Sequence, residues 1–395
     1  MIVKPKIRGY ICTTAHPAGC ARRVQDQIDY VRSRSKISNG PKKVLVIGAS
    51  TGYGLATRIT SAFGCGAATI GVFFEKPAAG DRTATAGWYN SAAFERAARA
   101  EGLYSRSFNG DAFSNEMKEQ VIRTIQNDLG SVDMVVYSLA APRRRHPQTG
   151  ETFKGVVKPR GAGYRNRALD LETLQITDVT TEPATEDEVR QTVGVMGGED
   201  WRMWTEALHE AGVLAEGALN VAYSYIGPEI TYPIYRHGTI GAAKDDLEKT
   251  AHDLDQFMRN VGGRALVSVN KALVTQASSA IPFMALYMTI LLKVMRSKGV
   301  DENCIEQIDR LFRERLFRDG EIPVDEQGRI RLDDLELSEE VQRDVHQAWQ
   351  EITTESIDRY ADVAGYQKDF LQIFGFEVEG VDYDEDADIH VPLEP

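Results

Sequence analysis

The chain has 395 residues, of which 42% are hydrophobic and 26% are charged, a composition typical of a folded globular protein. Its 46 Lys and Arg residues against 58 Asp and Glu residues give a net charge of −12, which argues against nucleic acid as a partner because nucleic-acid binders normally carry a basic face. The start of the chain lacks the apolar core of a signal peptide, and its four scattered cysteines form no Cys-x-x-Cys pair of the kind that binds zinc. We therefore expect a soluble cytoplasmic protein without a bound metal.

From Lys43 onward, expected strands alternate with expected helices. Residues 1–41 form an N-terminal extension that holds a polar helix near Val24–Ser35. The runs that follow are KVLVIG, LATRITSAF, AATIGVFF, SAAFERAARAEG, LYSRSF, EMKEQVIRTIQNDLG and VDMVVYSLA. Such alternation predicts parallel strands with right-handed crossovers. We therefore predict an α/β fold, a Rossmann-type doubly wound parallel sheet with helices on both faces.

Residues 142–199 interrupt the alternation. They are rich in Gly, Pro, Thr and charge and contain short alternating runs such as TLQITDV, so we expect a small β-rich insertion. The α/β pattern then resumes with a helix around Trp201–His209, a strand near Leu219–Tyr225, a long helix up to about Arg259 and the strand RALVSV.

The apolar stretch Ala280–Met295 is shorter than the ~20 residues of a membrane-spanning helix, so we expect a buried helix and no membrane partner. Residues 296–395 form a C-terminal, largely helical extension. Its expected elements are a helix at about Cys304–Arg318, a hairpin around GEIPVDEQGRIRL, a helix at about Ser338–Thr353 and an acidic tail. A single elaborated Rossmann-type domain over residues 1–395 fits this order better than two independent domains.

A glycine-rich turn, Gly48-Ala-Ser-Thr-Gly52-Tyr-Gly54, lies between an apolar strand and a helical stretch. Glycine lets the backbone approach a pyrophosphate, and the helix N-terminus offers unpaired N–H groups to it. Glu75 ends the next strand, 21 residues after Gly54, close to the ~20-residue interval of a ribose-binding acid. This combination predicts a nucleotide site; the alternative is an ordinary tight turn with a solvated Glu75. The Gly-x3-Gly-x-Gly spacing resembles the short-chain dehydrogenase/reductase superfamily.

Two later strand ends are candidates for further cofactor contacts, because ligands of open α/β sheets bind beyond the carboxyl ends of the strands. LYSRSF ends near Asp111 and Ala112, where members of that superfamily place an Asp on the adenine. VDMVVYS ends at Leu139 and Ala140, at the position of the superfamily's Asn-Ala-Gly turn, although the Asn is absent here.

Tyr235 and Lys244 are separated by eight residues. In the superfamily a Tyr and a downstream Lys form the catalytic pair, usually with three or six residues between them. Nine steps of about 100° place Tyr235 and Lys244 on opposite faces of a regular helix. Either the helix begins after Tyr235, or it is distorted around Gly238 and Gly241, where glycine supplies the freedom.

The spacing Tyr225-x9-Tyr235-x8-Lys244, with GASTGYG and the stretch NKALVTQASSAIP, resembles the FabV-type trans-2-enoyl-ACP/CoA reductases, from the MIVKP start to GFEVEGVDY near the end. The resemblance implies a monomeric, NADH-dependent enzyme of fatty acid synthesis that reduces a trans-2-enoyl thioester carried by ACP or CoA. It implies Tyr235 as proton donor, Tyr225 as the catalytic and substrate-binding residue at the thioester carbonyl, and Lys244 as the catalytic residue at the cofactor. The residues it assigns to NAD binding are Gly48, Ala49, Ser50, Thr51, Gly52, Tyr53, Phe74, Glu75, Asp111, Ala112, Leu139, Ala140, Lys244, Leu273, Val274 and Thr275.

Alternatives remain open from the residues themselves. Tyr235 and Lys244 could lie on the surface, Tyr225 could be a packed strand end, and Thr275 could be a helix N-cap. A short-chain ketoreductase would use the same Tyr and Lys, and Ser224 stands eleven residues before Tyr235, near the position of the ketoreductase Ser. A non-catalytic NAD-binding regulator would keep the glycine turn but has no reason to keep both tyrosines and the lysine.

A basic run, Arg143-Arg144-Arg145-His146, follows the strand end at Leu139 and Ala140. It is the densest candidate for docking an acidic carrier protein or the phosphates of CoA. The alternative is that these charges belong to a solvated loop.

Overall fold

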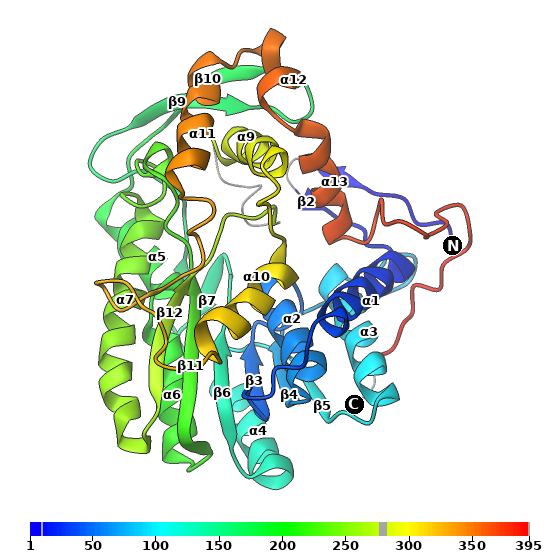
Figure 1. The fold of residues 1–395 in the computed structure, drawn as a ribbon, viewed down its shortest axis with the longest axis vertical. Helices are drawn as coiled ribbons and strands as arrows, with labels where there is room; N and C mark the ends of the chain where they lie inside the picture. Colours follow the sequence, from blue (N-terminus) through cyan, green and yellow to red (C-terminus); the bar gives the residue numbers. More distant parts are fainter. Residues whose placement is uncertain (9–10, 276–282, 394–395) are drawn as a thin grey trace.

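A seven-stranded parallel sheet forms the centre of the computed structural model, which describes residues 1–8, 11–275 and 283–393 (Figure 1). Its strands are β3 (Lys43–Ile47), β4 (Ala68–Phe73), β5 (Ser105–Asn109), β6 (Val132–Tyr137), β11 (Leu214–Ser224), β12 (Arg264–Val269) and β13 (Ile330–Arg331). Their order across the sheet is β13-β12-β11-β6-β3-β4-β5, and each pairing is parallel. The predicted Rossmann-type sheet is confirmed.

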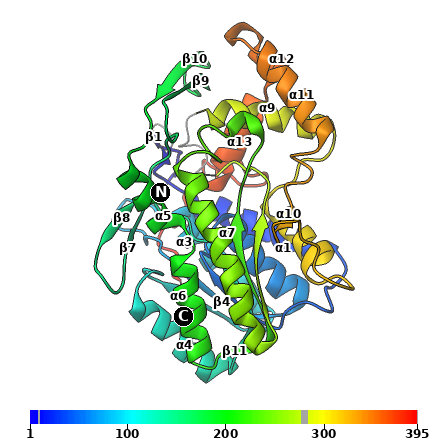
Figure 2. The ribbon, with the colours of Figure 1, turned by 90° about the vertical axis from the view of Figure 1, so that its left-hand side faces the viewer.

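Helices cover both faces of this sheet. They are α1 (Pro17–Ser33), α2 (Gly52–Ile59), α3 (Ala86–Ala100) and α10 (Cys304–Arg310) on one face, and α4 (Asn115–Thr124), α6 (Glu199–Glu210) and α7 (Thr239–Met258) on the other. Successive strand residues point to opposite faces: Val44 and Val46 of β3 pack toward the first group, and Leu45 and Ile47 toward the second. Figure 2 shows α4, α6 and α7 together on the second face.

Short antiparallel hairpins lie outside the main sheet. They are β1 (Ile7–Arg8) with β2 (Ile11–Cys12), β7 (Arg143–Arg145) with β8 (Thr152–Lys154), and β9 (Tyr164–Leu169) with β10 (Ile176–Thr181). The last two hairpins supply the β structure expected in residues 142–199. The same insertion also holds α5 (Glu186–Met196), which was not expected. Its capping box of Thr185 and Glu188 is a signal that the sequence shows.

Helices of the C-terminal part, together with the β9–β10 hairpin of the insertion, form a layer above the sheet (Figure 1). Its helices are α9 (Met284–Ser297), α11 (Glu339–Glu351), α12 (Ile357–Tyr360) and α13 (Val363–Ile373). As expected, α9 is a buried helix, although residues 280–282 of the expected stretch lie outside the described part of the chain.

One expectation for the C-terminal part is wrong. The hairpin around residues 320–332 is absent: a turn at residues 325–329 leads into β13, which pairs in parallel with β12 at the sheet edge and buries Ile330. After α11, the helices α12 and α13 continue the expected helical extension, and Tyr366 and Phe370 of α13 pack among apolar side chains.

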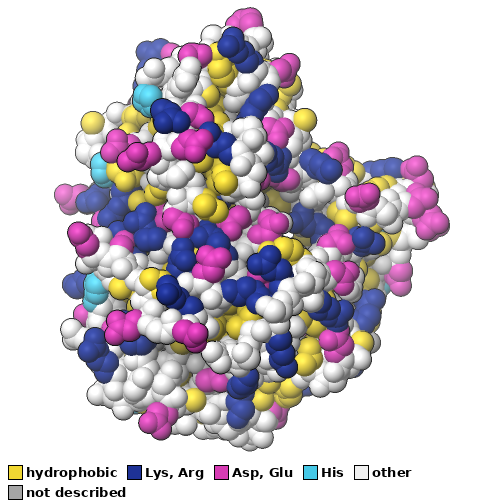
Figure 3. Space-filling model, in the orientation of Figure 1, with side chains coloured by type: hydrophobic (Ala, Val, Ile, Leu, Met, Phe, Trp, Pro, Cys, Tyr) yellow, Lys and Arg dark blue, Asp and Glu magenta, His cyan; other side chains and the backbone are white. Residues whose placement is uncertain are grey.

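Acidic and basic side chains are interspersed over the face shown in Figure 3. Among the residues that the structure describes, no helix is long and apolar enough to cross a membrane. The division of the chain into one domain over residues 1–395 stays a prediction.

Candidate active site

The glycine turn connects β3 to α2 in a backbone form that requires glycine. Gly48 has a φ of +92°, and a Cβ there would lie 2.3 Å from the Ser138 carbonyl oxygen. A Cβ at Gly54 would lie 1.9 Å from the Gly48 carbonyl oxygen. Thr51, the N-cap of α2, makes no side-chain capping bond, so the first N–H groups of the helix are left for a ligand. The turn fits a bound pyrophosphate.

Glu75 lies beside this turn, directly after β4. Its Oε1 accepts a hydrogen bond of 2.7 Å from the Ser50 hydroxyl. The Asn109 side chain holds the Glu75 backbone through bonds of 2.7 Å and 2.9 Å. Its neighbour Phe74 is 77% exposed, which leaves the ring free to cover a flat ligand group. A carboxylate beside the phosphate turn is where the ribose of a dinucleotide binds.

The remaining predicted cofactor residues follow strands of the same sheet. Ala112 is buried, and its carbonyl accepts a hydrogen bond of 3.0 Å from the Trp204 indole. Asp111 is exposed and accepts a bond from the Phe113 N–H. The other strand-end residues, which the structure places after β6 and β12, are Leu139, Ala140, Leu273, Val274 and Thr275.

Tyr225 and Tyr235 lie face to edge, with ring centroids 5.0 Å apart. Tyr225 directly follows β11, and Tyr235 precedes α7, which begins at Thr239. The helix thus begins after Tyr235, the first of the two alternatives that the Tyr–Lys spacing left open. The Tyr235 carbonyl accepts bonds from the N–H groups of Gly238 and Gly241.

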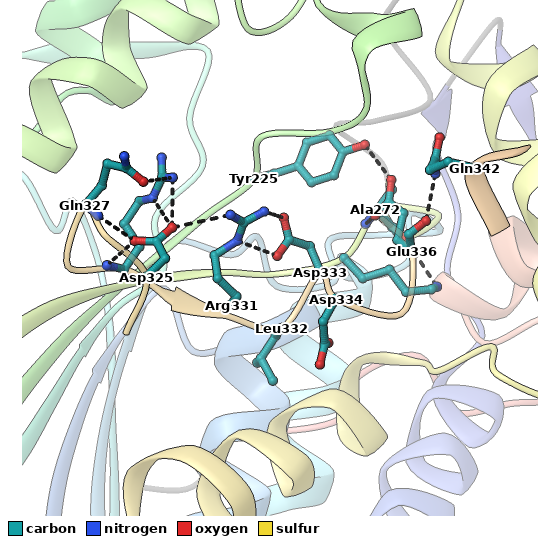
Figure 4. Close-up of polar contacts among 12 residues, drawn as sticks. Tyr225, Ala272, Asp325, Gln327, Arg331, Leu332, Asp333, Asp334, Glu336 and Gln342 are labelled. Carbon is teal, nitrogen blue, oxygen red and sulfur yellow. Dashed lines mark hydrogen bonds and ion pairs between the residues drawn. The ribbon is translucent and has the colours of Figure 1, made fainter. Parts of the chain in front are cut away.

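The two tyrosines differ in what their hydroxyls contact. Tyr225 donates to Glu336 Oε1 over 3.0 Å (Figure 4), whereas the Tyr235 hydroxyl makes no hydrogen bond to any residue that the structure describes. Burial, and next the Glu336 carboxylate, raise the pKa of Tyr235. Tyr235 is therefore a neutral phenol at physiological pH, and no described residue accepts its hydrogen.

Lys244 lies in the second turn of α7 and is partly buried. Burial lowers the pKa of its ammonium to about 8, although the nearby Glu248 acts in the opposite direction. Within the described part of the chain, Lys244 makes no ion pair or hydrogen bond, so its donors are available to a ligand.

Tyr53 has a packing role that the sequence did not indicate. Its hydroxyl donates to the Lys271 carbonyl over 2.8 Å and to Gln307 Oε1 over 3.1 Å. It thereby ties α2 to the segment after β12 and to α10. A cofactor contact from Tyr53 must come from its ring or backbone.

Arg144 shows that the basic run is not a continuous docking patch. It is 2% exposed, and its guanidinium donates to Glu199 over 2.6 Å and to the Gly194 carbonyl over 2.8 Å. His146 is also buried, so Arg143 and Arg145 are the exposed members of the run.

A parallel Rossmann-type sheet, a glycine turn with a nearby carboxylate, and a Tyr and Lys beyond the central strands define a dinucleotide-dependent reductase. Family models agree along nearly the whole chain. Residues 2–80 match the NAD(P)H binding domain of trans-2-enoyl-CoA reductase, and residues 82–317 match the trans-2-enoyl-CoA reductase catalytic region. The chain belongs to the trans-2-enoyl-CoA reductase family, which confirms the resemblance stated from its sequence.

Curated relatives carry two related names. An enoyl-[acyl-carrier-protein] reductase [NADH] of Opitutus terrae is 56% identical over 394 residues, 100% of both chains. A trans-2-enoyl-CoA reductase [NADH] of Ruminiclostridium cellulolyticum is also 56% identical, over 100% of this chain and 99% of the relative.

Two solved structures share the fold closely. Trans-2-enoyl-CoA reductase of Clostridium acetobutulicum in complex with NADH has a TM-score of 0.97 at 46% identity and 100% coverage of both chains. The Treponema denticola enzyme in complex with NAD has a TM-score of 0.95 at 51% identity and 98% coverage of both.

Residues 324–387 match a third model, described as an enoyl reductase FAD binding domain. These residues, all of which the structure describes, form β13 and α11 to α13. They contain no strand–glycine turn–helix unit like the one at Gly48, which is the unit that holds the pyrophosphate of a dinucleotide in a Rossmann-type site.

Proposed function

We propose that the chain reduces the C2=C3 double bond of a trans-2-enoyl thioester with NADH. The observation that carries the proposal is the Tyr235 phenol, which is buried and neutral, makes no hydrogen bond to a described residue, and lies against Tyr225 at the cofactor edge of the sheet. The family supports this reaction, since the named relatives are NADH-dependent reductases of enoyl thioesters.

The cofactor residues proposed here follow the geometry of the glycine turn. The backbone of Gly48 to Gly52 would hold the pyrophosphate, and Glu75 would accept a hydrogen bond from the adenosine ribose. When bound, NADH supplies a hydride to Cβ of the substrate. Lys244 would bind the nicotinamide ribose and place a positive charge near Tyr235.

Tyr235 acts where negative charge develops, on the thioester oxygen. A preorganised phenol that donates to this oxygen stabilises the transition state by about 3–4 kcal/mol, and protonation at Cα completes the reduction. Tyr225 would lie at the same carbonyl, but its hydrogen is shared with Glu336, so a substrate oxygen must compete with the carboxylate for it.

The carrier of the substrate is ACP or CoA in this proposal, because the relatives carry both names. We further propose that the chain acts as a monomer in the cytoplasm. The ketoreductase alternative rests on Ser224, which is 5% exposed and whose hydroxyl makes no hydrogen bond to Tyr235 or to any other described residue.

The experiment that tests the function mixes the protein with NADH and either crotonyl-CoA or acetoacetyl-CoA, and follows the absorbance of NADH. We expect oxidation of NADH with crotonyl-CoA alone. Oxidation with acetoacetyl-CoA alone would identify a ketoreductase, and NADH binding without oxidation of either would identify a regulator.

A further inference from the structure

Glu336 comes from the C-terminal part of the chain yet reaches the proposed active site. It lies in a turn after β13 in which the Leu337 N–H donates to the Asp333 carbonyl over 2.8 Å. Its backbone carbonyl accepts a bond of 2.7 Å from the Gln342 side chain, and its side chain is 0% exposed. The backbone of Glu336 is therefore fixed within its turn, and its side chain lies in the protein interior (Figure 4).

Three donors from three parts of the fold converge on this carboxylate. The Tyr225 hydroxyl after β11 donates to Oε1 over 3.0 Å, and the Tyr287 hydroxyl on α9 donates to the same oxygen over 2.6 Å. The Ala272 N–H after β12 donates to Oε2 over 2.7 Å. A buried carboxylate persists only if its oxygens are satisfied in this way.

Lys271, a cation close enough to act on the charge of Glu336, makes no direct ion pair with it. Lys271 is buried, and its ammonium binds Asp301 over 2.9 Å and the Ala272 and Glu302 carbonyls. The hydrogen bonds therefore hold the carboxylate, and Tyr225 is one of the three groups whose position depends on it.

We propose that Glu336 is a positioning residue, which fixes the phenol of Tyr225 beside Tyr235 so that both hydroxyls face one substrate oxygen. The inference rests on the proposed role of Tyr225 at the thioester carbonyl. The length of the Glu336 side chain places its carboxylate within hydrogen-bond distance of the Tyr225 hydroxyl and so fixes the position of that hydroxyl. Because a phenol has one hydrogen, the same contact keeps Tyr225 a weaker donor than Tyr235.

Two substitutions at position 336 distinguish the effect of side-chain length from the effect of negative charge. Glu336→Asp keeps the negative charge but withdraws the acceptor by one methylene. We expect kcat to fall roughly 10- to 100-fold, because a misplacement of about 1 Å near the reacting atoms has an effect of this order. Glu336→Gln keeps the reach, and its amide can bond Ala272 and Tyr225, so we expect its kcat to stay within about fivefold of wild type. NADH affinity, measured by fluorescence titration, should be unchanged within twofold in both.

Asp333 offers the matched control. It lies in the same turn, is also 0% exposed, and accepts two bonds of 2.7 Å from Arg331. Asp333→Asn should lower the melting temperature while kcat stays within twofold of wild type. If Asp333→Asn lowers kcat as much as Glu336→Asp does, the effect comes from a loosened turn, and the positioning role is wrong.

The Tyr225→Phe variant closes the test. In that background Glu336→Asp should lower kcat by less than threefold, because its effect passes through the absent hydroxyl. The inference would be overturned if Glu336→Asp lowered kcat 10- to 100-fold in the Tyr225→Phe background as well, or if Glu336→Asp alone had the wild-type kcat. It would also be overturned if Glu336→Gln lowered kcat more than Glu336→Asp does. If Tyr225→Phe itself matches wild type in kcat and KM, the proposed role of Tyr225 is wrong. This result needs no Glu336 variant, so it is distinguishable from a failure of the inference about Glu336.

Discussion

Replacing Tyr235 by Phe removes one oxygen atom and should separate catalysis from stability. The Tyr235 hydroxyl makes no hydrogen bond to any described residue, and the ring itself is 9% exposed. Phe keeps that ring packing, so the free energy of unfolding should change by less than about 1 kcal/mol. The loss of a donor to the developing enolate, in contrast, should lower kcat by about 10²–10³, equivalent to about 2.7–4 kcal/mol.

The assay measures kcat with saturating NADH and crotonyl-CoA, NADH affinity by titration, and thermal unfolding. Tyr225→Phe is the comparison, because it removes one of three donors to the buried Glu336 and should lower stability by about 1–3 kcal/mol. If Tyr235→Phe retained more than a tenth of the wild-type kcat, Tyr235 would not be the donor. A large loss of stability in the same variant would show that its hydroxyl has a structural partner.

Lys244→Ala should lower kcat and also weaken NADH binding, because we propose that its ammonium binds the nicotinamide ribose. Unchanged affinity in a titration would show that Lys244 does not contact the cofactor. Because burial lowers the pKa of Lys244 to about 8, its charge is present below this pH and is lost as the pH rises through it. Wild-type kcat should therefore decline on the alkaline side, and a decline of equal size in Lys244→Ala would assign it to another group. Glu75→Ser should raise activity with NADPH relative to NADH, since a carboxylate repels a 2′-phosphate; equal wild-type activity with both cofactors would contradict this.

The cofactor edge of the sheet could be predicted because its signals are local. The turn from Gly48 to Gly54 stands between a strand and a helix, and Glu75 follows the next strand. The glycines lie within the turn that they make possible, and Glu75 lies directly after the strand that positions it. The sequence left two alternatives for the start of α7: a helix that begins after Tyr235, or one that is distorted around Gly238 and Gly241. The structure selects the first, with a helix that begins at Thr239.

Contacts between distant segments could not be predicted in the same way. Glu336 lies 111 residues after Tyr225, in a stretch without a motif, and its role depends on where β13 joins the sheet. Arg144 stands among other basic residues, which favours a solvated patch, yet it pairs with Glu199, 55 residues further along the chain. The two-residue β13 is too short to show a strand period, so the same residues favoured a hairpin.

Tyr225 and Tyr235 have the same side chain, and their different proposed roles follow from their hydrogen-bond partners. Tyr225 can offer its hydrogen to a substrate oxygen only by leaving Glu336, so the transition state gains the new bond minus the lost one. Tyr235 has no such bond to lose among the described residues, and it gains the full interaction. Burial and the nearby carboxylate raise the pKa of Tyr235, which in the proposed mechanism would keep its proton in place until negative charge develops on the substrate. The same physics predicts that Tyr235→Phe lowers kcat more than Tyr225→Phe does, and the reverse order would show that the two hydroxyls have exchanged roles.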